Sequence, residues 1–184
     1  MKKFLAIALV AVLAMTAVFA NGSSESASEI KIGFIGPLTG DYANYGTLCR
    51  QAVEMAIDEC NAKGGINGST VKLVAEDSEG DPNKALAAME KLANTDKVCA
   101  VVGPVLTGEA FSVGPVACEL GVLAVTPSAS HKDVTNQGDY IFRTTPSDGL
   151  QGEVAGKYWA QVLGYKKIAT LYAKNDYSQG LAEG

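Results

Sequence analysis

The segment Ile30-Lys31-Ile32-Gly33-Phe34-Ile35 decides the fold class of this 184-residue sequence. Its β-branched and aromatic residues favour a buried strand, and the loop 36–45 that follows contains glycine and proline. Beyond this loop, apolar residues recur at intervals of three and four, which is typical of an amphipathic helix. These apolar residues are Leu48, Cys49, Ala52, Val53, Ala56, Ile57 and Cys60. The helix is expected to end near Lys63, before Gly64-Gly65.

The same alternation of strand and helix continues along the chain. Further strands are predicted at 71–74, 98–102 and 122–125. Helices are expected after Asp81-Pro82, an N-cap followed by a first-turn proline, and from a capping Thr107 onward. Because parallel strands need a crossover connection, this order predicts a parallel sheet with helices on both faces.

A binding site is expected at one edge of this sheet. Ligands of open α/β sheets bind outside the carboxyl ends of the strands. The loops at those ends are 36–45, 77–81, 103–107 and 126–132.

The C-terminal part of the sequence predicts the beginning of a second α/β unit. Residues 140–146 form an extended pattern, after which Ser147 or Asp148 can cap a helix that stops at Gly164. A strand is predicted at 167–172, followed by the first turns of another helix. A lone strand and helix cannot bury a core, so this unit is expected to be incomplete.

Residues 1–20 predict a cleavable signal peptide. Lysines at positions 2 and 3 precede an apolar run, and Val18-Phe19-Ala20 places small residues where signal peptidase reads the chain. An uncleaved anchor is the alternative, although the apolar run is shorter than the roughly 20 residues that span a bilayer. Residues 21–29 are predicted to be a polar tether. Cleavage implies an extracytoplasmic protein, periplasmic or otherwise secreted.

Charge and cysteine content exclude several classes of protein. The net charge is −5, and removing the two lysines of the signal peptide makes it −7, which argues against a nucleic-acid partner. The spacing of the four cysteines matches no zinc site or CxxC motif. If any disulfide forms, Cys99 and Cys118 are the expected pair, because the predicted strand and helix directions place both at the amino edge of the sheet. Cys49 and Cys60 lie three turns apart on one predicted helix and cannot pair. Buried free thiols are the alternative.

From Ile30 to Gly180 the sequence resembles the leucine/isoleucine/valine-binding protein family of type I periplasmic binding proteins. The resemblance rests on the order and spacing of several short motifs. They are Ile35-Gly36-Pro37-Leu38-Thr39-Gly40, Tyr45-Gly46, Ile57-Asp58, 61–68, Asp77, Asp81-Pro82, Val102-Gly103-Pro104, 125–130, 142–148, Asp176-Tyr177 and Gly180.

The resemblance implies two Rossmann-like α/β lobes with a ligand held in the cleft between them. Lobe one would span 30–141, a crossing segment 142–148, and the truncated start of lobe two 149–184. It implies a monomeric substrate-binding component that delivers an amino acid, branched-chain or related, to the permease of an ABC importer. No catalytic residue, metal or cofactor is implied. A receptor ectodomain of the same fold is the alternative.

The resemblance also implies the ligand-binding residues. Thr107, Ser128 and Ser130 match the positions that hold the carboxylate and ammonium of the ligand, while Tyr45 and Tyr177 match aromatic residues of the cleft wall. A helix N-terminus suits a carboxylate, because it offers unpaired N–H groups and a favourable dipole. For each of these residues, a role as helix cap or in packing is the alternative.

Two departures from the family pattern bear on ligand choice. Glu109 stands in a stretch that is small and hydroxylated in relatives, so it either alters ligand choice or faces solvent. Gly80 and Leu106 occupy the positions of a cysteine pair in the branched-chain amino-acid binder, so that disulfide is absent.

Enzymatic classes fit the sequence poorly. A dinucleotide-binding site needs the GxGxxG spacing, whereas Gly33, Gly36 and Gly40 are spaced 3 and 4 apart. The only histidine, His131, lies in a loop without a GxSxG motif, so a hydrolase lacks its nucleophile and base. This histidine is expected to be a solvated loop residue.

Overall fold

The computed structural model describes residues 29–184. The predicted signal peptide and all but the last residue of the predicted tether lie outside the described residues.

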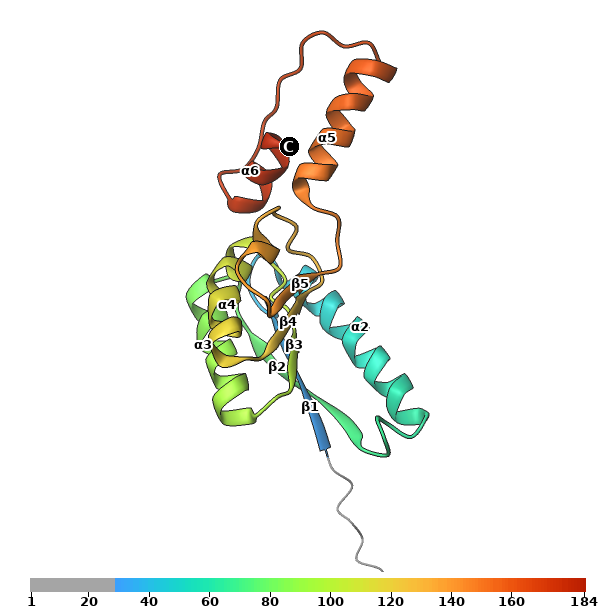
Figure 1. The fold of residues 1–184 in the computed structure, drawn as a ribbon, viewed down its shortest axis with the longest axis vertical. Coiled ribbons are helices and arrows are strands. Elements are labelled where there is room, and N and C mark those ends of the chain that lie inside the picture. Colours follow the sequence, from blue (N-terminus) through green and yellow to red (C-terminus); the bar gives the residue numbers. More distant parts are fainter. Residues whose placement is uncertain (1–28) are drawn as a thin grey trace, which may run out of the picture.

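Five parallel strands form one sheet in the order β2-β1-β3-β4-β5 (Figure 1). The strands are β1 (Glu29–Gly36), β2 (Thr70–Asp77), β3 (Ala100–Val102), β4 (Leu123–Thr126) and β5 (Ile141–Arg143). The predicted parallel sheet is therefore confirmed. Residues of β5, which were expected to begin the crossing segment, pair with β4, and the outer limits of that segment stay a prediction.

Helices cover both faces of this sheet. Figure 1 shows α3 (Pro82–Lys91) and α4 (Thr107–Leu120) on one face and α2 (Ala43–Ala62) on the other. Short π-helical and 3-10 segments follow at η1 (Leu92–Asp96) and η2 (Val134–Asn136). Beyond the sheet, α5 (Asp148–Lys157) continues into η3 (Tyr158–Val162), and α6 (Asp176–Glu183) packs against α5. No helix within residues 29–184 has both the length and the apolar character to cross a bilayer.

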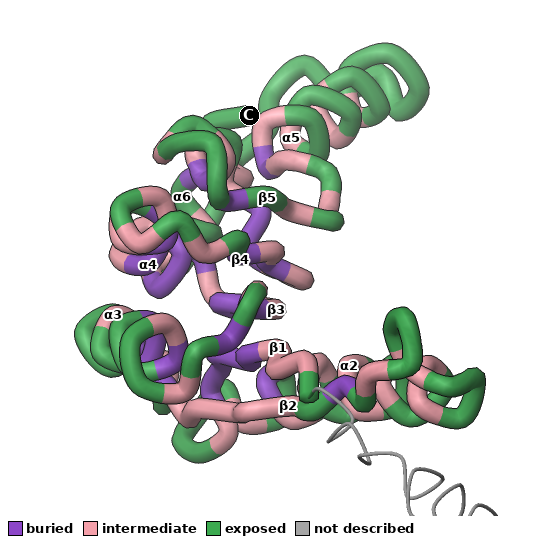
Figure 2. Tube along the Cα trace, turned by 60° about the horizontal axis from the view of Figure 1, so that its bottom comes forward, coloured by how far each residue is buried: buried purple, intermediate pink, exposed green. Residues whose placement is uncertain are grey.

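The hydrophobic core lies between the sheet and the two helices α3 and α4 (Figure 2). Ile35 of β1 and Val101 of β3 pack there against Met89 and Leu92. By contrast, the only buried residue of α2 is Gly46. The two faces of the sheet are therefore covered to very different degrees.

Two of the predicted helix starts are confirmed by the structure, and two differ from it. The side chain of Asp81 accepts hydrogen bonds from the first turn of α3, and that of Ser147 accepts one from Leu150, as predicted. Thr107 was expected to cap α4, but Leu106 is the N-cap and Thr107 is the first helical residue. The prediction that residues 36–45 form a loop was also wrong at its end, because α2 begins at Ala43.

The strand predicted at 167–172 is not formed. The segment is irregular and exposed, and no strand among the described residues pairs with it. A β-branched run becomes a strand only when a neighbour accepts and donates its backbone hydrogen bonds. Sequence pattern alone cannot supply that neighbour.

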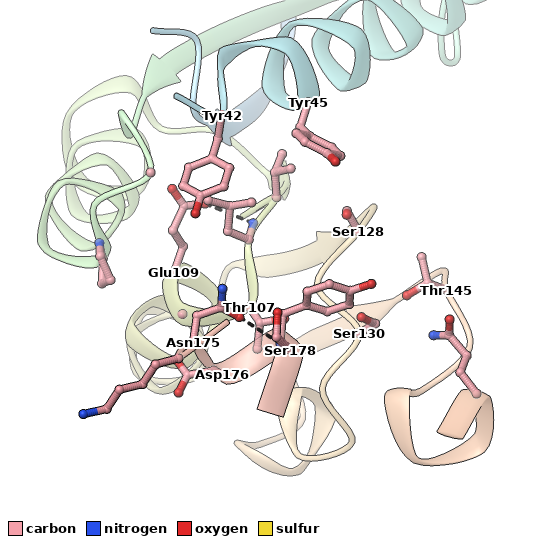
Figure 3. A pocket seen from close by; sticks show the side chains of 18 of the residues that line it. Tyr42, Tyr45, Thr107, Glu109, Ser128, Ser130, Thr145, Asn175, Asp176 and Ser178 are labelled. Carbon is pink, nitrogen blue, oxygen red and sulfur yellow. Dashed lines mark hydrogen bonds between the residues drawn. The ribbon is translucent and has the colours of Figure 1, made fainter. Parts of the chain in front are cut away.

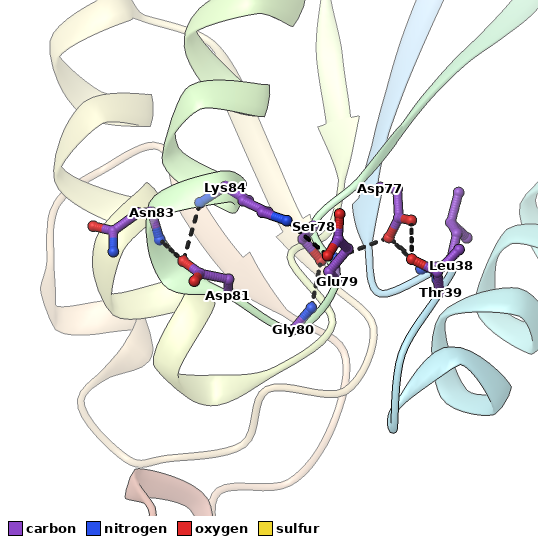
Figure 4. A network of polar contacts seen from close by, with 9 residues as sticks. All are labelled: Leu38, Thr39, Asp77, Ser78, Glu79, Gly80, Asp81, Asn83 and Lys84. Atoms are coloured by element: carbon purple, nitrogen blue, oxygen red, sulfur yellow. Dashed lines mark hydrogen bonds and ion pairs between the residues drawn. The ribbon is translucent and has the colours of Figure 1, made fainter.

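Asp77, the last residue of β2, fastens the loop that follows β1 (Figure 4). Its Oδ1 accepts hydrogen bonds from Leu38 N at 2.7 Å and from Glu79 N at 2.9 Å, and its Oδ2 accepts one from Thr39 Oγ1 at 2.5 Å. Partial burial raises the pKa of this carboxyl, but the Thr39 hydroxyl and the N–H groups of Glu79, Leu38 and Thr39 outweigh burial and hold it below its usual range.

Asp77→Asn is expected to destabilise the fold by about 2 kcal/mol at pH 7, because hydrogen bonds to a charged group are lost. A lowered carboxyl pKa stabilises the fold above the unfolded-state value of about 4, and this stability is lost as the pH falls from there through the lower folded-state pKa. The difference between variant and wild type should therefore shrink below about pH 4. Urea unfolding across pH measures it, with Asp58→Asn on exposed α2 surface as the control. An equal loss in both variants would contradict the assignment.

Candidate ligand-binding cleft

A cleft of about 850 Å³ opens at the carboxyl ends of the strands, where the sequence predicted a site (Figure 3). Lobe-one loops and the start of α2 line one side, and α6 with the residues before it lines the other. All five predicted ligand-binding residues lie along it, namely Thr107, Ser128, Ser130, Tyr45 and Tyr177. Their role in binding a ligand stays a prediction.

Thr107 occupies the N-terminus of α4 at the floor of this cleft. Its side chain is 3% exposed, and its Oγ1 has no hydrogen-bond partner in the described chain. Because the hydroxyl caps no backbone group, the first turn of α4 presents both a free hydroxyl and free N–H groups. This combination can bind an anionic or hydrogen-bonding group.

The loop after β4 carries the two serines into the same cleft. Thr126 shapes this loop, because its Oγ1 accepts hydrogen bonds from Ser128 N at 3.3 Å and Ala129 N at 2.9 Å. Ser130 is nearly buried, and its carbonyl accepts a hydrogen bond from Asp148 N at 2.8 Å. The Ser130 carbonyl is therefore already engaged, while its hydroxyl lines the cleft.

Tyrosines stand on opposite walls. Tyr45 projects from the first turn of α2 and is 62% exposed, and Tyr177 projects from the first turn of α6 and is 46% exposed. Neither is buried in a core. Tyr42, one turn before Tyr45, was not predicted, although it also lines the cleft.

A second helix N-terminus, that of α6, lies on the other wall; the sequence predicted the first turns of this helix but not its place in the cleft. Asn175 caps α6, with its Oδ1 accepting a hydrogen bond from Ser178 N at 2.8 Å. Asn175, Asp176 and Ser178 all line the cleft together with Tyr177. Asparagine is a preferred N-cap residue, so the sequence could have indicated this cap. Where the cap lies relative to α4 depends on the tertiary fold.

Glu109 is fully buried beneath the cleft, so the interpretation that it faces solvent is wrong. Its Oε2 accepts a hydrogen bond from Leu106 N at 3.1 Å, which satisfies the N-cap of α4. Burial raises the pKa of this carboxyl, against the opposing effect of the Ser78 hydroxyl and the N–H groups of Leu106 and Val105.

Glu109→Gln is expected to stabilise the fold on the order of 1 kcal/mol at pH 8, because glutamine can keep the bond to Leu106 N without burying a charge. A carboxyl whose pKa is raised in the folded state favours folding at low pH and loses that contribution as the pH rises through the folded-state value. The gain should therefore disappear toward pH 4. Thermal unfolding at several pH values measures it, with Glu119→Gln on the exposed side of α4 as control. A gain independent of pH would contradict this.

All four cysteines are free in the structure. Cys118 Sγ donates a weak hydrogen bond to Gln137 O at 3.8 Å, and Cys99 is exposed. The conditional pairing of Cys99 with Cys118 is not formed here.

Comparison with known proteins yields one consistent group. A profile of the family described as periplasmic binding protein matches residues 29–184. The Leu/Ile/Val-binding protein BraC3 of Rhizobium johnstonii is 41% identical over 157 residues, which are 85% of this chain and 42% of that protein. A leucine-, isoleucine-, valine-, threonine- and alanine-binding protein of Pseudomonas aeruginosa is 40% identical over 160 residues, which are 86% of this chain and 43% of that protein. The chain thus spans less than half the length of these curated relatives.

Solved structures agree in fold. The branched-chain amino acid transporter substrate-binding protein LivJ of Streptococcus pneumoniae, in complex with isoleucine, has a TM-score of 0.80 and 34% identity, covering 85% of this chain and 45% of LivJ. An ABC transporter solute-binding protein of Rhodopseudomonas palustris, in complex with 4-hydroxybenzoate, has a TM-score of 0.73 and 29% identity, covering 85% of this chain and 42% of that one. These related proteins are binding proteins rather than enzymes.

Proposed function

The chain belongs to the periplasmic binding protein family, and from this we propose that it is the extracytoplasmic substrate-binding component of an ABC importer for an amino acid. Its ligand would be a branched-chain amino acid or a related molecule. The partners would be the permease subunits of that importer, and the protein would act as a monomer without catalytic activity.

The observation that carries this proposal is the free hydroxyl of Thr107 at the N-terminus of α4. A buried polar atom without a hydrogen-bond partner costs free energy unless a bound molecule supplies that partner. A ligand carboxylate would accept a hydrogen bond from the Thr107 hydroxyl, and the first-turn N–H groups and helix dipole of α4 would add to its binding. The Ser130 hydroxyl, on the neighbouring loop, lies in reach of the same cleft.

The ligands of two related structures support the choice of a carboxylate. Isoleucine in LivJ and 4-hydroxybenzoate in the Rhodopseudomonas palustris protein differ in size, ring and amine, but both carry a carboxylate. The tyrosines at positions 45 and 177 would enclose the remaining, less polar part of the ligand.

Isothermal titration calorimetry of the complete protein tests the proposal. The panel contains the free amino acids, their methyl esters and 4-hydroxybenzoate. We expect micromolar or tighter binding of at least one free amino acid and loss of binding for its ester. Binding of the ester equal to that of the free acid, or no binding across the amino acids, would reject the proposal.

A further inference from the structure

Asp148, the first residue of α5, is a buried carboxyl group that the ligand-binding proposal does not use. Its exposed fraction is 0%, and neither Oδ1 nor Oδ2 has a hydrogen-bond partner among the described residues. Buried carboxylates in folded proteins are normally paired or hydrogen-bonded, because isolated burial of a charge is costly. A group close to this carboxyl is therefore expected to interact with it.

The ring of His131 is a candidate, because Gly180 of α6 lies against both groups. A Cβ placed on Gly180 would be 3.1 Å from Nε2 of His131 and 3.3 Å from Oδ2 of Asp148. The Nδ1 of His131 accepts a hydrogen bond from Asp133 N at 3.2 Å, so a neutral ring carries its proton on Nε2. The proton-bearing nitrogen thus shares one small space with the unpaired carboxyl. His131 is also only 15% exposed, so the expectation of a solvated loop histidine was wrong.

This cluster connects the two walls of the cleft. The N–H of Asp148 donates to the carbonyl of Ser130 at 2.8 Å, and His131 is the next residue along that loop. On the other wall, Gly180 follows Tyr177 by about one turn of α6. Whatever seats Gly180 against Asp148 and His131 also sets the distance between Ser130 and Tyr177.

We propose that Asp148, His131 and Gly180 form a docking point that seats α6 and so positions Ser130 and Tyr177 around the ligand. The three are positioning residues, and their effect on ligand affinity rests on the function proposed above. Gly180 is required because the methyl group of an alanine would lie only 2.4 Å from Cδ2 of His131.

Other charged groups surround His131, but none is as buried as Asp148. Asp133 Oδ2 lies 3.9 Å from Nδ1 with its side chain 49% exposed, and Arg143 donates to the carbonyl of His131 rather than to its ring. On the remaining sides, Phe111 of α4 meets the ring edge-on, and Lys132, Glu153 and Glu183 line a small neighbouring cavity with Gly180. The carboxyl of Asp148 is therefore the charged group beside the ring that solvent screens least.

Proton NMR of His131 tests the docking point without any ligand. Asp148→Asn should shift the ring-proton resonances of His131, because a neutral amide replaces the buried carboxyl beside the ring. Asp133→Asn is the matched control, and its effect should be smaller because that side chain is half exposed. His131→Gln assigns the signal. Equal effects of the two aspartate variants, or no effect of Asp148→Asn, would overturn the proposal whatever the ligand is.

Ligand titrations then test the coupling to the cleft. Gly180→Ala should weaken the best ligand at least tenfold, whereas Gly156→Ala, a helical glycine of α5 with open space around it, should not. His131→Gln and Asp148→Asn should each weaken the same ligand as well. Wild-type affinity in both of these variants, or wild-type affinity of Gly180→Ala, would overturn the positioning role. If the NMR effect appears but no amino acid binds the wild type, the proposed function fails and the docking point stands.

Discussion

Thr107→Ala is expected to weaken binding of the best free amino acid by about tenfold to a hundredfold in the complete protein. A charge-assisted hydrogen bond contributes about 1.5–3 kcal/mol, and about 1.4 kcal/mol corresponds to a factor of ten in the dissociation constant. The Thr107 hydroxyl is free to make this bond, because it is buried at the floor of the cleft and no group within residues 29–184 pairs with it. Calorimetry with the preferred ligand measures the loss.

Folding stability separates this role from that of a helix cap. Loss of a capping threonine costs about 1 kcal/mol, whereas Thr107 caps nothing in the structure, so Thr107→Ala should leave thermal unfolding of the ligand-free protein nearly unchanged. Thr107→Ser keeps the hydroxyl and should retain most of the affinity. An unchanged affinity in Thr107→Ala, or a stability loss of about 1 kcal/mol without ligand, would place the anchor elsewhere.

Gly46→Ala is expected to destabilise the fold by about 2 kcal/mol. A Cβ on Gly46 would lie 2.0 Å from the carbonyl oxygen of Pro37, which is backbone and cannot rotate away. Relieving such a clash costs about 3 kcal/mol, and the better helix propensity of alanine returns at most about 1 kcal/mol. The clash therefore outweighs the propensity, and the melting temperature should fall by about 4–8 °C.

Gly156→Ala provides the matched control for this substitution. It is also a helical glycine, but no atom lies within 4 Å of its Cβ position, so only the propensity term remains and the fold should be stabilised slightly. The start of α2 carries Tyr42 and Tyr45, so Gly46→Ala should also weaken ligand binding. If both alanine variants shifted the melting temperature in the same direction, the close contact with Pro37 would not be the reason for glycine at position 46.

Local pattern was sufficient for the layered fold. The apolar runs at 30–35, 71–74, 98–102 and 122–125 became β1 to β4, because strand periodicity and crossover geometry depend on residues near one another in sequence. The same holds for the caps at Asp81 and Ser147, where a side chain bonds to backbone two or three residues away. The edge at which the site would lie also followed from strand direction alone.

Where the local sequence pattern and the tertiary contacts favour different environments for a residue, the tertiary contacts determine the structure. The run at 167–172 has strand composition, but no strand in the described part of the chain pairs with it. Glu109 has a charged side chain but lies wholly inside the protein. Likewise, the sequence predicted that His131 is a solvated loop residue, whereas in the structure Gly180 of α6 lies against its ring. Burial and pairing are properties of segments distant in sequence, so no window of residues reveals them.

The sequence by itself therefore determined the parallel α/β sheet, the helices that connect its strands, and the loops from which a ligand site could be built. Only the tertiary structure decided that the Thr107 hydroxyl is free, that α6 faces α4 across the cleft, and that Asp148 and His131 meet at Gly180. The physical reason is that periodicity and capping act over one or two turns of chain, whereas the environment of a polar group depends on which distant segments exclude water from it.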